Sequence, residues 1–353
     1  MELSDSQLVR DPAEGAPLLI SAAEACDAIE QLFGLRGELT LMGGDRDCNF
    51  RLRLDRGTSW MIKFVHPSEH ETSTLTQCLV LHELQRVDPT LRLPQPYQPL
   101  TGTHFAVWER PGELGLPPVR VRCYSFLTGT PVANVSPGAL TRAALGTALA
   151  TLDAALNACV VPVAEFRDDV LWDVRRLPEL GCRWDGYDLD SAAARQLDHV
   201  FDHALPAAAK LPQQVIHNDM NPQNILVAED NPTRVTGIID FGDLVRASRA
   251  QDLATLAAYH VTTQEHPLAG PAQIIRSYHD RTPLLDGEVR VLFDLMLARL
   301  VLIVRMSEWM SRRYPGNSRY FLRNNAAARA ALTALAEINC SQAADYFRSH
   351  LEG

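Results

Sequence analysis

The stretch that decides the fold reads VIHNDMNPQNILV at residues 215–227 and, after a short acidic turn, VTGIIDFGDLVRASRAQDLA at residues 235–254. In the first segment an apolar run leads into Asp219, and Asn224 follows five residues later. In the second segment another apolar run leads directly into Asp240. Short apolar runs bounded by polar turn residues are typical of buried strands. The pattern therefore predicts two strands that deliver carboxylate and amide side chains to one point.

These polar residues are the parts that phosphoryl transfer requires: a carboxylate beside the accepting hydroxyl, and an amide with a second carboxylate to hold magnesium. We interpret Asp219 as the catalytic base, and Asn224 and Asp240 as ligands of Mg²⁺, which prefers oxygen donors. A lone loop aspartate more often caps a turn, and the joint occurrence of all three decides against that alternative. His217 is predicted to hold the loop by hydrogen bonds, without a part in proton transfer. The segment predicts a small-molecule kinase.

Length and charge set the broad class. The chain has 353 residues, which exceeds the usual size of a single domain and predicts two lobes. Its formal net charge is -10, with 33 Lys and Arg against 43 Asp and Glu. A nucleic-acid-binding protein normally carries a basic stripe. The balance therefore argues against nucleic acid as a partner and favours cationic over anionic substrates.

The seven cysteines are scattered without a Cys-x-x-Cys pair, so the sequence suggests neither a disulfide framework nor a zinc site. Free thiols fit a reducing compartment, and the first residues carry acids where a signal peptide has an apolar core, which predicts the cytoplasm. The most apolar helical stretch, residues 289–310, is interrupted by Asp294, Arg299 and Arg305. We therefore expect a buried helix there and no association with a membrane.

The order of predicted elements indicates an α+β protein with two lobes. Ser21 and Glu24 form a capping box for a helix that ends near residue 35. Strand-like segments, one helix and two more strands follow, at residues 38–42, 49–54, 59–65, 71–87 (helix), 104–109 and 119–126. Helices then dominate, at residues 137–158, 191–210, 253–259, 273–279, 287–310 and 324–339. We predict an N-terminal nucleotide-binding lobe with an antiparallel sheet, residues 1–125, and a mainly helical catalytic and substrate-binding lobe, residues 126–353.

Gly43 and Gly44 lie in a predicted hairpin turn, where glycine lets backbone amides approach phosphates closely. Alone the signal is weak, because Gly-Gly-Asp is also an ordinary turn. Lys63 alternates with apolar neighbours on a later strand, and a solvated strand lysine is the alternative. Its position one hairpin after the glycines favours a lysine that binds phosphate.

Together these residues resemble the aminoglycoside phosphotransferase-like kinases, a branch of the protein-kinase-like fold. The resemblance extends over about residues 39–257, where HNDMNPQN matches the catalytic loop His-x-Asp-x-x-x-x-Asn and IDFGD matches the magnesium-binding segment. Asp252 matches an acid that stabilises structure near the catalytic loop. The chain looks closest to the hydroxylysine-kinase-like subgroup, because of His-Asn-Asp, Phe-Gly-Asp, and Leu171-Trp172-Asp173 followed by Arg175 and Pro178.

The resemblance implies a bilobal protein-kinase-like fold and transfer of the terminal phosphate of ATP or GTP to a hydroxyl of a small, amine-bearing molecule, with Mg²⁺ as the metal. The nucleotide base is expected against the connector at residues 123–127, which makes Ser125 and Leu127 candidate binding residues. In such folds the lysine usually pairs with a glutamate on the following helix. Gln77 stands at that position here, and Glu71 on the same helix is the alternative partner of Lys63.

The acceptor is expected to bind in the helical lobe. Candidates for holding a cation, by charge pairing or a cation–π contact, are Asp169, Trp172, Asp173, Asp243 and Trp309. For each residue alone, a solvated acid or a core tryptophan is the commoner explanation.

Three functions remain open at this point. We favour a kinase of a hydroxylysine-like amino alcohol. An antibiotic-inactivating aminoglycoside phosphotransferase is the alternative, and the few acids in residues 341–353 disfavour such a multiply charged substrate. A kinase-like sensor of nucleotide or metabolite is the alternative of another class, and the complete set of base and metal ligands disfavours it.

Overall fold

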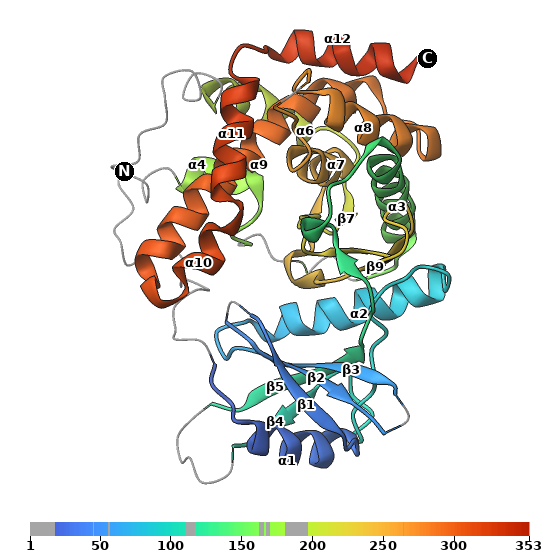
Figure 1. Cartoon of the computed structure of the whole chain (residues 1–353), viewed down its shortest axis with the longest axis vertical. Coiled ribbons are helices and arrows are strands. Elements are labelled where there is room, and N and C mark those ends of the chain that lie inside the picture. Colours follow the sequence, from blue (N-terminus) through green and yellow to red (C-terminus); the bar gives the residue numbers. More distant parts are fainter. Residues whose placement is uncertain are drawn as a thin grey trace. The chain divides into compact units, whose positions relative to one another are not determined.

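The computed structural model describes residues 18–44, 46–55, 57–110, 117–161, 166, 170–180, 197–263 and 265–352. The chain divides into two compact units, Met1–Thr128 with Cys159–Arg167, and Gly129–Ala158 with Asp168–Gly353. A sheet dominates the first unit and helices dominate the second (Figure 1). The assignment of nucleotide binding to a lobe that ends at residue 125, and of catalysis to the remainder, stays a prediction.

The first unit is built on a five-stranded sheet in the order β1-β2-β3-β5-β4, with every neighbouring pair antiparallel. The strands are β1 (Glu38–Met42), β2 (Cys48–Arg53), β3 (Ser59–Phe64), β4 (Ala106–Trp108) and β5 (Val119–Ser125), and the helices are α1 (Ala22–Phe33) and α2 (Glu71–Val87). The predicted capping box is confirmed, because Ser21 accepts from the Glu24 amide while Glu24 accepts from the Ser21 amide.

The two helices of the first unit cover opposite faces of its sheet (Figure 1). Because side chains alternate along a strand, each strand contributes to both faces. Phe50, Ile62 and Phe64 belong to one core with the buried side of α1. Their neighbours face α2 instead: Arg122 of β5 contacts Gln77 of α2, and it stands opposite Lys63 in the β3–β5 register. The polar face of the sheet thus lies under α2.

The second unit carries short strand pairs among its helices. The strands are β6 (Thr130–Pro131), β7 (Gln214–Ile216), β8 (Ile225–Val227), β9 (Val235–Ile238) and β10 (Val245–Ala247). Antiparallel pairs join β7 to β10, β8 to β9, and β6 to β8. The main helices are α3 (Ala139–Ala158), α7 (Arg249–Ala258), α8 (Ala269–Arg281), α9 (Asp286–Arg313), α11 (Asn325–Leu335) and α12 (Cys340–Leu351). Shorter turns of helix are η1 (Val132–Asn134), η3 (Val174–Arg176), α4 (Leu177–Leu180), η5 (Val200–Ala204), α6 (Leu205–Ala208), η6 (Phe241–Asp243), η7 (Pro315–Asn317), α10 (Ser318–Phe321) and η8 (Leu322–Asn324).

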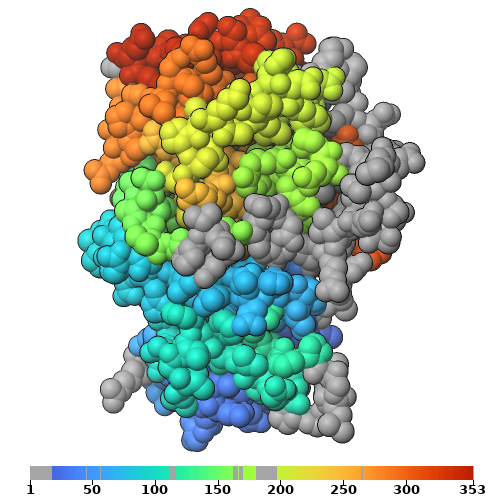
Figure 2. Space-filling model, turned by 180° about the vertical axis from the view of Figure 1, so that it is seen from behind, coloured from blue at the N-terminus to red at the C-terminus, as the bar shows by residue number. Residues whose placement is uncertain are grey.

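The long helix α9 forms the centre of this unit, since it packs against α7, α11 and α12 and buries residues on every side. The prediction of a buried helix at residues 287–310 is therefore confirmed. In the part of the chain that the structure describes, no helix is long and apolar enough to cross a membrane. Figure 2 shows the C-terminal helix α12, in red, lying on the orange segments α8 and α9.

Most predicted helices of the second unit are confirmed with bounds shifted by a few residues. The helix predicted at residues 191–210 falls partly on residues 181–196, which lie outside the described residues. From residue 197 the chain is helical and passes through the π turn η5. The sequence analysis missed α12, whose capping box pairs Asn339 with Gln342.

Candidate active site

Two strand ends bring the predicted metal ligands together. Asn224 immediately precedes β8, and Asp240 follows Ile239 just after β9. In the β8–β9 pair Ile225 stands opposite Ile238, and the Ile239 amide donates to the Asn224 carbonyl at 2.9 Å. Since the strands run antiparallel, the start of one and the end of the other lie at the same edge. The backbones of Asn224 and Asp240 therefore lie close together, although the two residues are sixteen positions apart in the sequence.

Asp219 lies between β7 and β8, where neighbouring amides and a cation hold its carboxylate. Its Oδ2 accepts hydrogen bonds from Asn221 Nδ2 and Asn224 Nδ2, both at 2.8 Å, and its main-chain carbonyl accepts from Asn224 Nδ2 at 3.0 Å. Its Oδ1 accepts from the guanidinium of Arg299 at 2.5 Å. The side chain is 16% exposed, so one edge of the carboxylate still meets solvent. The Asn224 amide uses its nitrogen toward Asp219, which directs its oxygen away from this carboxylate.

Backbone strain is concentrated at this site. Among the described residues, the two non-glycine positions with positive φ are Asn218, at 67°, and Asp240, at 66°. Such a conformation costs non-glycine residues roughly 1–3 kcal/mol and persists where the surroundings enforce it. One position precedes the predicted base and the other is a predicted metal ligand. The fold thus fixes both side chains in orientations that a relaxed chain would not choose.

Buried side chains from α7 hold the loop in this conformation. Asp252 accepts the backbone amides of His217 and Asn218 at 2.8 and 2.9 Å. Gln251 donates to Asn218 Oδ1 at 2.9 Å and to Asp173 Oδ1 at 3.1 Å. Two consecutive residues of one helix therefore bind both the main chain and a side chain of the loop.

His217 connects the two segments that the sequence singled out. Its Nε2 lies 3.1 Å from the Ile239 carbonyl, and its Nδ1 accepts from the Asp219 amide at 3.3 Å. These two contacts fit a neutral imidazole with its proton on Nε2. The ring also meets Phe241 edge-on, with centroids 4.7 Å apart. These contacts link the loop that carries Asp219 to the segment that carries Asp240.

Arg299 of α9 is a site residue that the sequence analysis missed as such. The residue is 1% exposed, and its guanidinium donates to Asp219 and, at 3.1 Å, to the Trp172 carbonyl. It lies 5.4 Å over the Trp172 ring and 5.9 Å over the Tyr259 ring. Burial alone would lower the pKa of this guanidinium, but Tyr259 and Asp219 reverse that effect and raise it. The available signal was a charged residue inside an apolar helix, because a buried charge requires a partner.

A pair of buried acids lies behind the loop. Burial, and then the neighbouring Asp252, raise the pKa of Asp153 far above its usual range. Burial likewise raises the pKa of Asp252. The Tyr278 hydroxyl donates to Asp153 Oδ2 at 2.6 Å. Two carboxyl groups in contact cannot both ionise at low cost, so Asp153 keeps a proton and Asp252 carries the charge that binds the loop amides.

The predicted acceptor-binding residues have different surroundings. Trp172 already stacks on a protein cation, Arg299. Asp173 is 1% exposed, forms an ion pair with Arg175 and accepts from Gln251, so its carboxylate is engaged within the protein. Asp243 and Trp309 are half-buried on η6 and α9. Asp169 lies outside the described residues. Contacts of these residues with a substrate stay predictions.

The two glycines of the turn in the first unit differ in the space around them. The space beside Gly43 is open, whereas Gly44 has no room for a side chain. A Cβ at Gly43 would meet nothing within 4 Å, whereas a Cβ at Gly44 would lie 2.7 Å from the Asp47 carbonyl. The Asn49 side chain reaches back to the Gly43 carbonyl at 3.4 Å, and its own oxygen is buried without a hydrogen bond among the described residues. The turn therefore packs closely against Asp47 and Asn49 at Gly44, and it leaves free space beside Gly43.

Lys63 forms an ion pair with Asp47, with Nζ 3.4 Å from Oδ2. Gln77 accepts a hydrogen bond from Arg122, a fully buried arginine that also lies 3.7 Å from Glu69. Burial alone would raise the pKa of Asp47, but Lys63 and Arg122 outweigh it and lower the pKa. The sequence suggested Gln77 and Glu71 as partners of Lys63 and gave no sign of the ion pair with Asp47. It also gave no sign that Gln77 accepts from Arg122.

At the end of β5, some of the polar groups of the connector already form hydrogen bonds within the protein. The Ser125 amide donates to the Gln95 carbonyl at 2.8 Å, and the Ser125 hydroxyl accepts from the Gln95 amide at 2.9 Å. Leu127 is half-buried two residues further on. A nucleotide base that binds at Ser125 would have to use its carbonyl, because the amide already has a partner.

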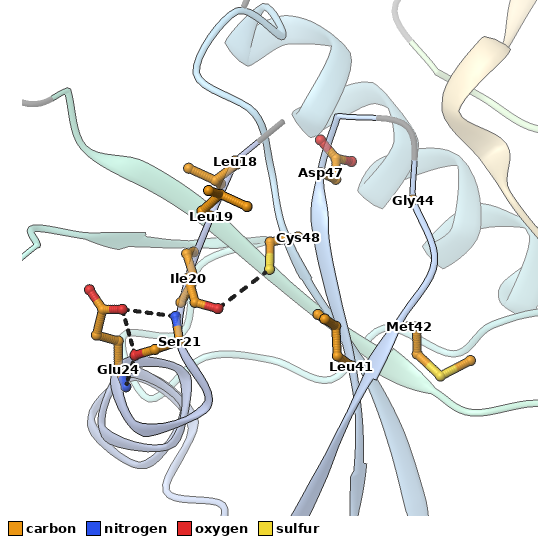
Figure 3. A pocket seen from close by; sticks show the side chains of 10 residues that line it. All are labelled: Leu18, Leu19, Ile20, Ser21, Glu24, Leu41, Met42, Gly44, Asp47 and Cys48. Atoms are coloured by element: carbon orange, nitrogen blue, oxygen red, sulfur yellow. Dashed lines mark hydrogen bonds between the residues drawn. The ribbon is translucent and has the colours of Figure 1, made fainter. Parts of the chain in front are cut away.

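A pocket of about 440 Å³ lies beside the glycine turn, and Figure 3 shows its lining. Gly44 and Asp47 belong to it together with Leu18, Leu41 and Met42. Ser21 and Glu24 at its side are occupied with each other in the capping box of α1 (Figure 3). Its lining is thus mostly apolar and includes neither Lys63 nor the carboxylates of the second unit.

A model of a phosphotransferase enzyme family matches residues 38–286. No curated protein matches the chain.

Solved structures of similar fold include three whose ligands or substrates are named. An amicoumacin kinase in complex with AMP-PNP and Ca²⁺ has a TM-score of 0.64 at 13% identity, over 87% of this chain and 94% of that one. A microcompartment-associated aminopropanol kinase has a TM-score of 0.61 at 17% identity, over 94% and 99%. A spectinomycin phosphotransferase bound to AMP has a TM-score of 0.59 at 14% identity, over 91% and 100%. The bilobal kinase-like α+β fold predicted from the sequence is confirmed.

Proposed function

Because the chain belongs to the phosphotransferase enzyme family, and is thus a small-molecule phosphotransferase, we propose that it transfers the terminal phosphate of ATP or GTP to a hydroxyl of a small amine-bearing metabolite. The observation that carries the proposal is the joint placement of Asp219, Asn224 and Asp240 by two short strand pairs. A phosphoryl transfer needs these groups in one place and little other covalent chemistry from the protein.

Asp219 acts as the base in this proposal. Its Oδ2 is held by two amide donors and its Oδ1 by Arg299, so the carboxylate has one orientation. The acceptor hydroxyl gives its proton to Asp219 while its oxygen bonds to the terminal phosphorus. The bond from that phosphorus to the bridging oxygen breaks, and the nucleoside diphosphate leaves with the electron pair. Positioned proton transfer of this kind contributes about 10²–10⁴-fold to the rate.

Asn224 and Asp240 fit a magnesium ion by donor chemistry and by position. An amide oxygen and a carboxylate are hard oxygen donors of the type that Mg²⁺ selects. They lie at one edge of the β8–β9 pair, and the Asn224 amide directs its nitrogen to Asp219, which leaves its oxygen for another partner. Asn224 and Asp240 would hold Mg²⁺, and the ion would supply neutralisation of phosphate charge. The positive φ of Asp240 shows that the fold imposes the orientation of this residue.

Arg299 contacts both the proposed base and two aromatic residues, Trp172 and Tyr259, beside it. It joins Asp219 to the Trp172 carbonyl and to the Tyr259 hydroxyl, the latter at 3.4 Å. A bound acceptor would therefore meet a carboxylate whose Oδ1 is held by Arg299 and whose Oδ2 is held by two amides. In the first unit we assign nucleotide binding to Gly43, Gly44 and Lys63, and to the backbone at Ser125 and Leu127, while Gln77 supports the group through Arg122.

We place the chain in the hydroxylysine-kinase-like subgroup and favour an amino alcohol as acceptor. Its support is the net charge of -10 and the sequence pattern around Trp172. An aminopropanol kinase is among the proteins of similar fold. Antibiotic inactivation is the second candidate, because kinases of amicoumacin and spectinomycin share the fold as well.

The test is a magnesium-dependent screen of nucleotide consumption with purified protein. ATP and GTP are each offered with hydroxylysine, aminopropanol and other amino alcohols, choline, methylthioribose, spectinomycin and several aminoglycosides. We expect turnover with an amino alcohol that disappears with EDTA and in Asp219→Asn. Turnover with an antibiotic alone would overturn the acceptor assignment. Binding of magnesium nucleotide without any turnover would favour a sensor.

A further inference from the structure

A second cluster of chemically active side chains lies within the second unit. It consists of His199, in the helical turn before η5, Asp294 of α9 and Cys340, the first residue of α12. One potential ligand atom from each lies within 4.8 Å of the other two. Residues from three separate elements, with a nitrogen, an oxygen and a sulfur donor, thus converge on one point.

Within the described part of the chain, Asp294, the buried member of this cluster, has no hydrogen-bonded partner for its carboxylate. The Asp294 side chain is 7% exposed, and its described ionic neighbour is His199, with Nε2 at 3.7 Å from Oδ2. That separation is too long for a hydrogen bond. A buried carboxylate without a hydrogen-bonded partner is costly unless a cation or a proton compensates it.

A fourth donor is available on the same helix. His203 follows His199 by four residues, and the two rings lie 4.9 Å apart. Histidines at this spacing lie on one helical face, which is how helices present paired imidazoles to a metal. Imidazole and thiolate are donors that select zinc and other borderline metals over magnesium or calcium. The donor set therefore differs in kind from Asn224 and Asp240.

We propose that His199, His203, Asp294 and Cys340 form a binding site for Zn²⁺. Tetrahedral zinc with bonds of about 2.0–2.3 Å places its ligands roughly 3.3–3.8 Å apart. The His199–Asp294 separation of 3.7 Å already fits, and the ligand atoms of His199, Asp294 and Cys340 lie within 4.8 Å of one another, so they need to contract by up to about 1 Å. His203 lies outside this group of three, and its ring has to turn toward the ion to complete the set. Binding releases the thiol proton of Cys340, after which one thiolate and one carboxylate balance the two charges of the ion.

Such a site has a structural role. Four protein ligands close the coordination sphere and leave no position for a substrate. The ion would connect the start of α12 to the middle of α9 and to the segment at His199, so it would stabilise the packing of the C-terminal helix, which already contacts α9. The Cys-x-x-Cys test applied to the sequence could not find it, because its ligands are up to 141 residues apart, from His199 to Cys340.

The test uses the full chain without a histidine tag. Protein is equilibrated with excess ZnSO₄ and then with a weak chelator, and the retained metal is counted by mass spectrometry. We expect one zinc per chain in the wild type and loss of at least tenfold in affinity in Cys340→Ser and Asp294→Asn. The matched controls Cys159→Ser and His350→Asn, which change a half-buried cysteine and an exposed histidine elsewhere, should retain it. Asp240→Asn should retain it too, which separates this ion from one at Asn224 and Asp240.

Two further readouts keep the proposal open to refutation if a variant folds poorly. In the wild type, Co²⁺ should give a sulfur-to-cobalt charge-transfer band that Cys340→Ser alone among the cysteine variants removes. Zinc should also protect Cys340, and not Cys159, from alkylation. Zinc retained equally by every variant, or alkylation of Cys340 unaffected by zinc, would overturn the site and leave Asp294 and His199 as a proton-sharing pair.

Discussion

Each unit contains a buried arginine beside the residues to which we assign a function. The partners that surround the buried positive charge differ between the two units. Arg299 in the second unit contacts an ionised carboxylate, a backbone carbonyl and two aromatic rings. Arg122 in the first unit donates to a neutral amide, Gln77, while Glu69 lies further off at 3.7 Å and the lysine in register beside it adds a second cation.

This difference indicates what each face is prepared to bind. The charge of Arg299 is matched within the protein, so its task is to hold Asp219 in place. Lys63 and Arg122 stand side by side on one face of the sheet and share Asp47. Lys63 is the more exposed of the two cations, and the buried Arg122 beside it adds positive charge that would favour the phosphates of a nucleotide. We therefore expect substitutions in the two units to affect different kinetic constants.

The largest effect is expected at the base itself. Asp219→Asn keeps the shape of the side chain and removes the proton acceptor, so kcat should fall about 10³-fold, within the range for a positioned base. Nucleotide affinity should change less than about threefold, because no nucleotide contact is assigned to Asp219. Steady-state kinetics and nucleotide titration measure the two quantities. Asp230→Asn, an exposed acid in the turn between β8 and β9, is the matched control. Retention of wild-type turnover in Asp219→Asn would refute the assignment.

A smaller loss is expected when Arg299 is removed. Arg299→Ala leaves Asp219 with its two amide donors and deprives it of its cation, so kcat should fall about 10²-fold with little change in nucleotide KM. The variant should also lose about 3 kcal/mol of stability, as for a broken buried pair.

Chemical rescue distinguishes positioning from a general structural defect. Added guanidinium should restore part of kcat in Arg299→Ala. The control variant Arg313→Ala, at the exposed end of the same helix, should keep the wild-type kcat without added guanidinium. If Arg299→Ala raised the nucleotide KM and left kcat unchanged, Arg299 would contribute to nucleotide binding, the role that we assign to Arg122. That result would contradict the proposed difference between the two arginines.

The sequence could predict the segments of the candidate site because their residues are close along the chain. Asp219, Asn224 and Asp240 lie beside short strands whose apolar runs are visible in the sequence. Contacts between distant elements left no comparable pattern: Arg299 reaches Asp219 from 80 residues away, and Arg122 reaches Gln77 across 45. Spacing on one element can propose a partner for Lys63 on the next helix, but it cannot show that Asp47 on the preceding hairpin forms an ion pair with it.

At the nucleotide face the expected effect is on affinity. Arg122→Met removes one cation of the pair, together with the donor to Gln77 and the ionic partner of Glu69, so nucleotide KM should rise about tenfold, equivalent to about 1.4 kcal/mol. We expect kcat at saturating nucleotide to change less than about threefold. Arg53→Met, which disrupts an exposed ion pair with Glu38 at the far end of β2, is the control. A fall in kcat as large as that of Arg299→Ala, with KM unchanged, would contradict a separation of tasks between the units.

The last expected effect is on stability and its pH dependence, with no kinetic constant involved, and it concerns the buried acids Asp153 and Asp252. Asp153 keeps a proton because burial and Asp252 raise its pKa from the ordinary value of 3.8. The native state then binds this proton more tightly than the unfolded chain. The resulting stability is full below pH 3.8 and declines as pH rises toward the raised pKa, by about 1.4 kcal/mol per pH unit.

Asp153→Asn removes this slope while it preserves both contacts. The amide nitrogen can donate to Asp252, and the amide oxygen can accept from Tyr278, as the protonated acid does. The difference in unfolding free energy between variant and wild type should therefore shift in favour of the variant as pH rises from 5 to 8, measured by urea denaturation. Asp230→Asn should show no such trend. A difference independent of pH would mean that the proton is not held by this pair, and that Asp252 is compensated by a cation as Asp219 is by Arg299.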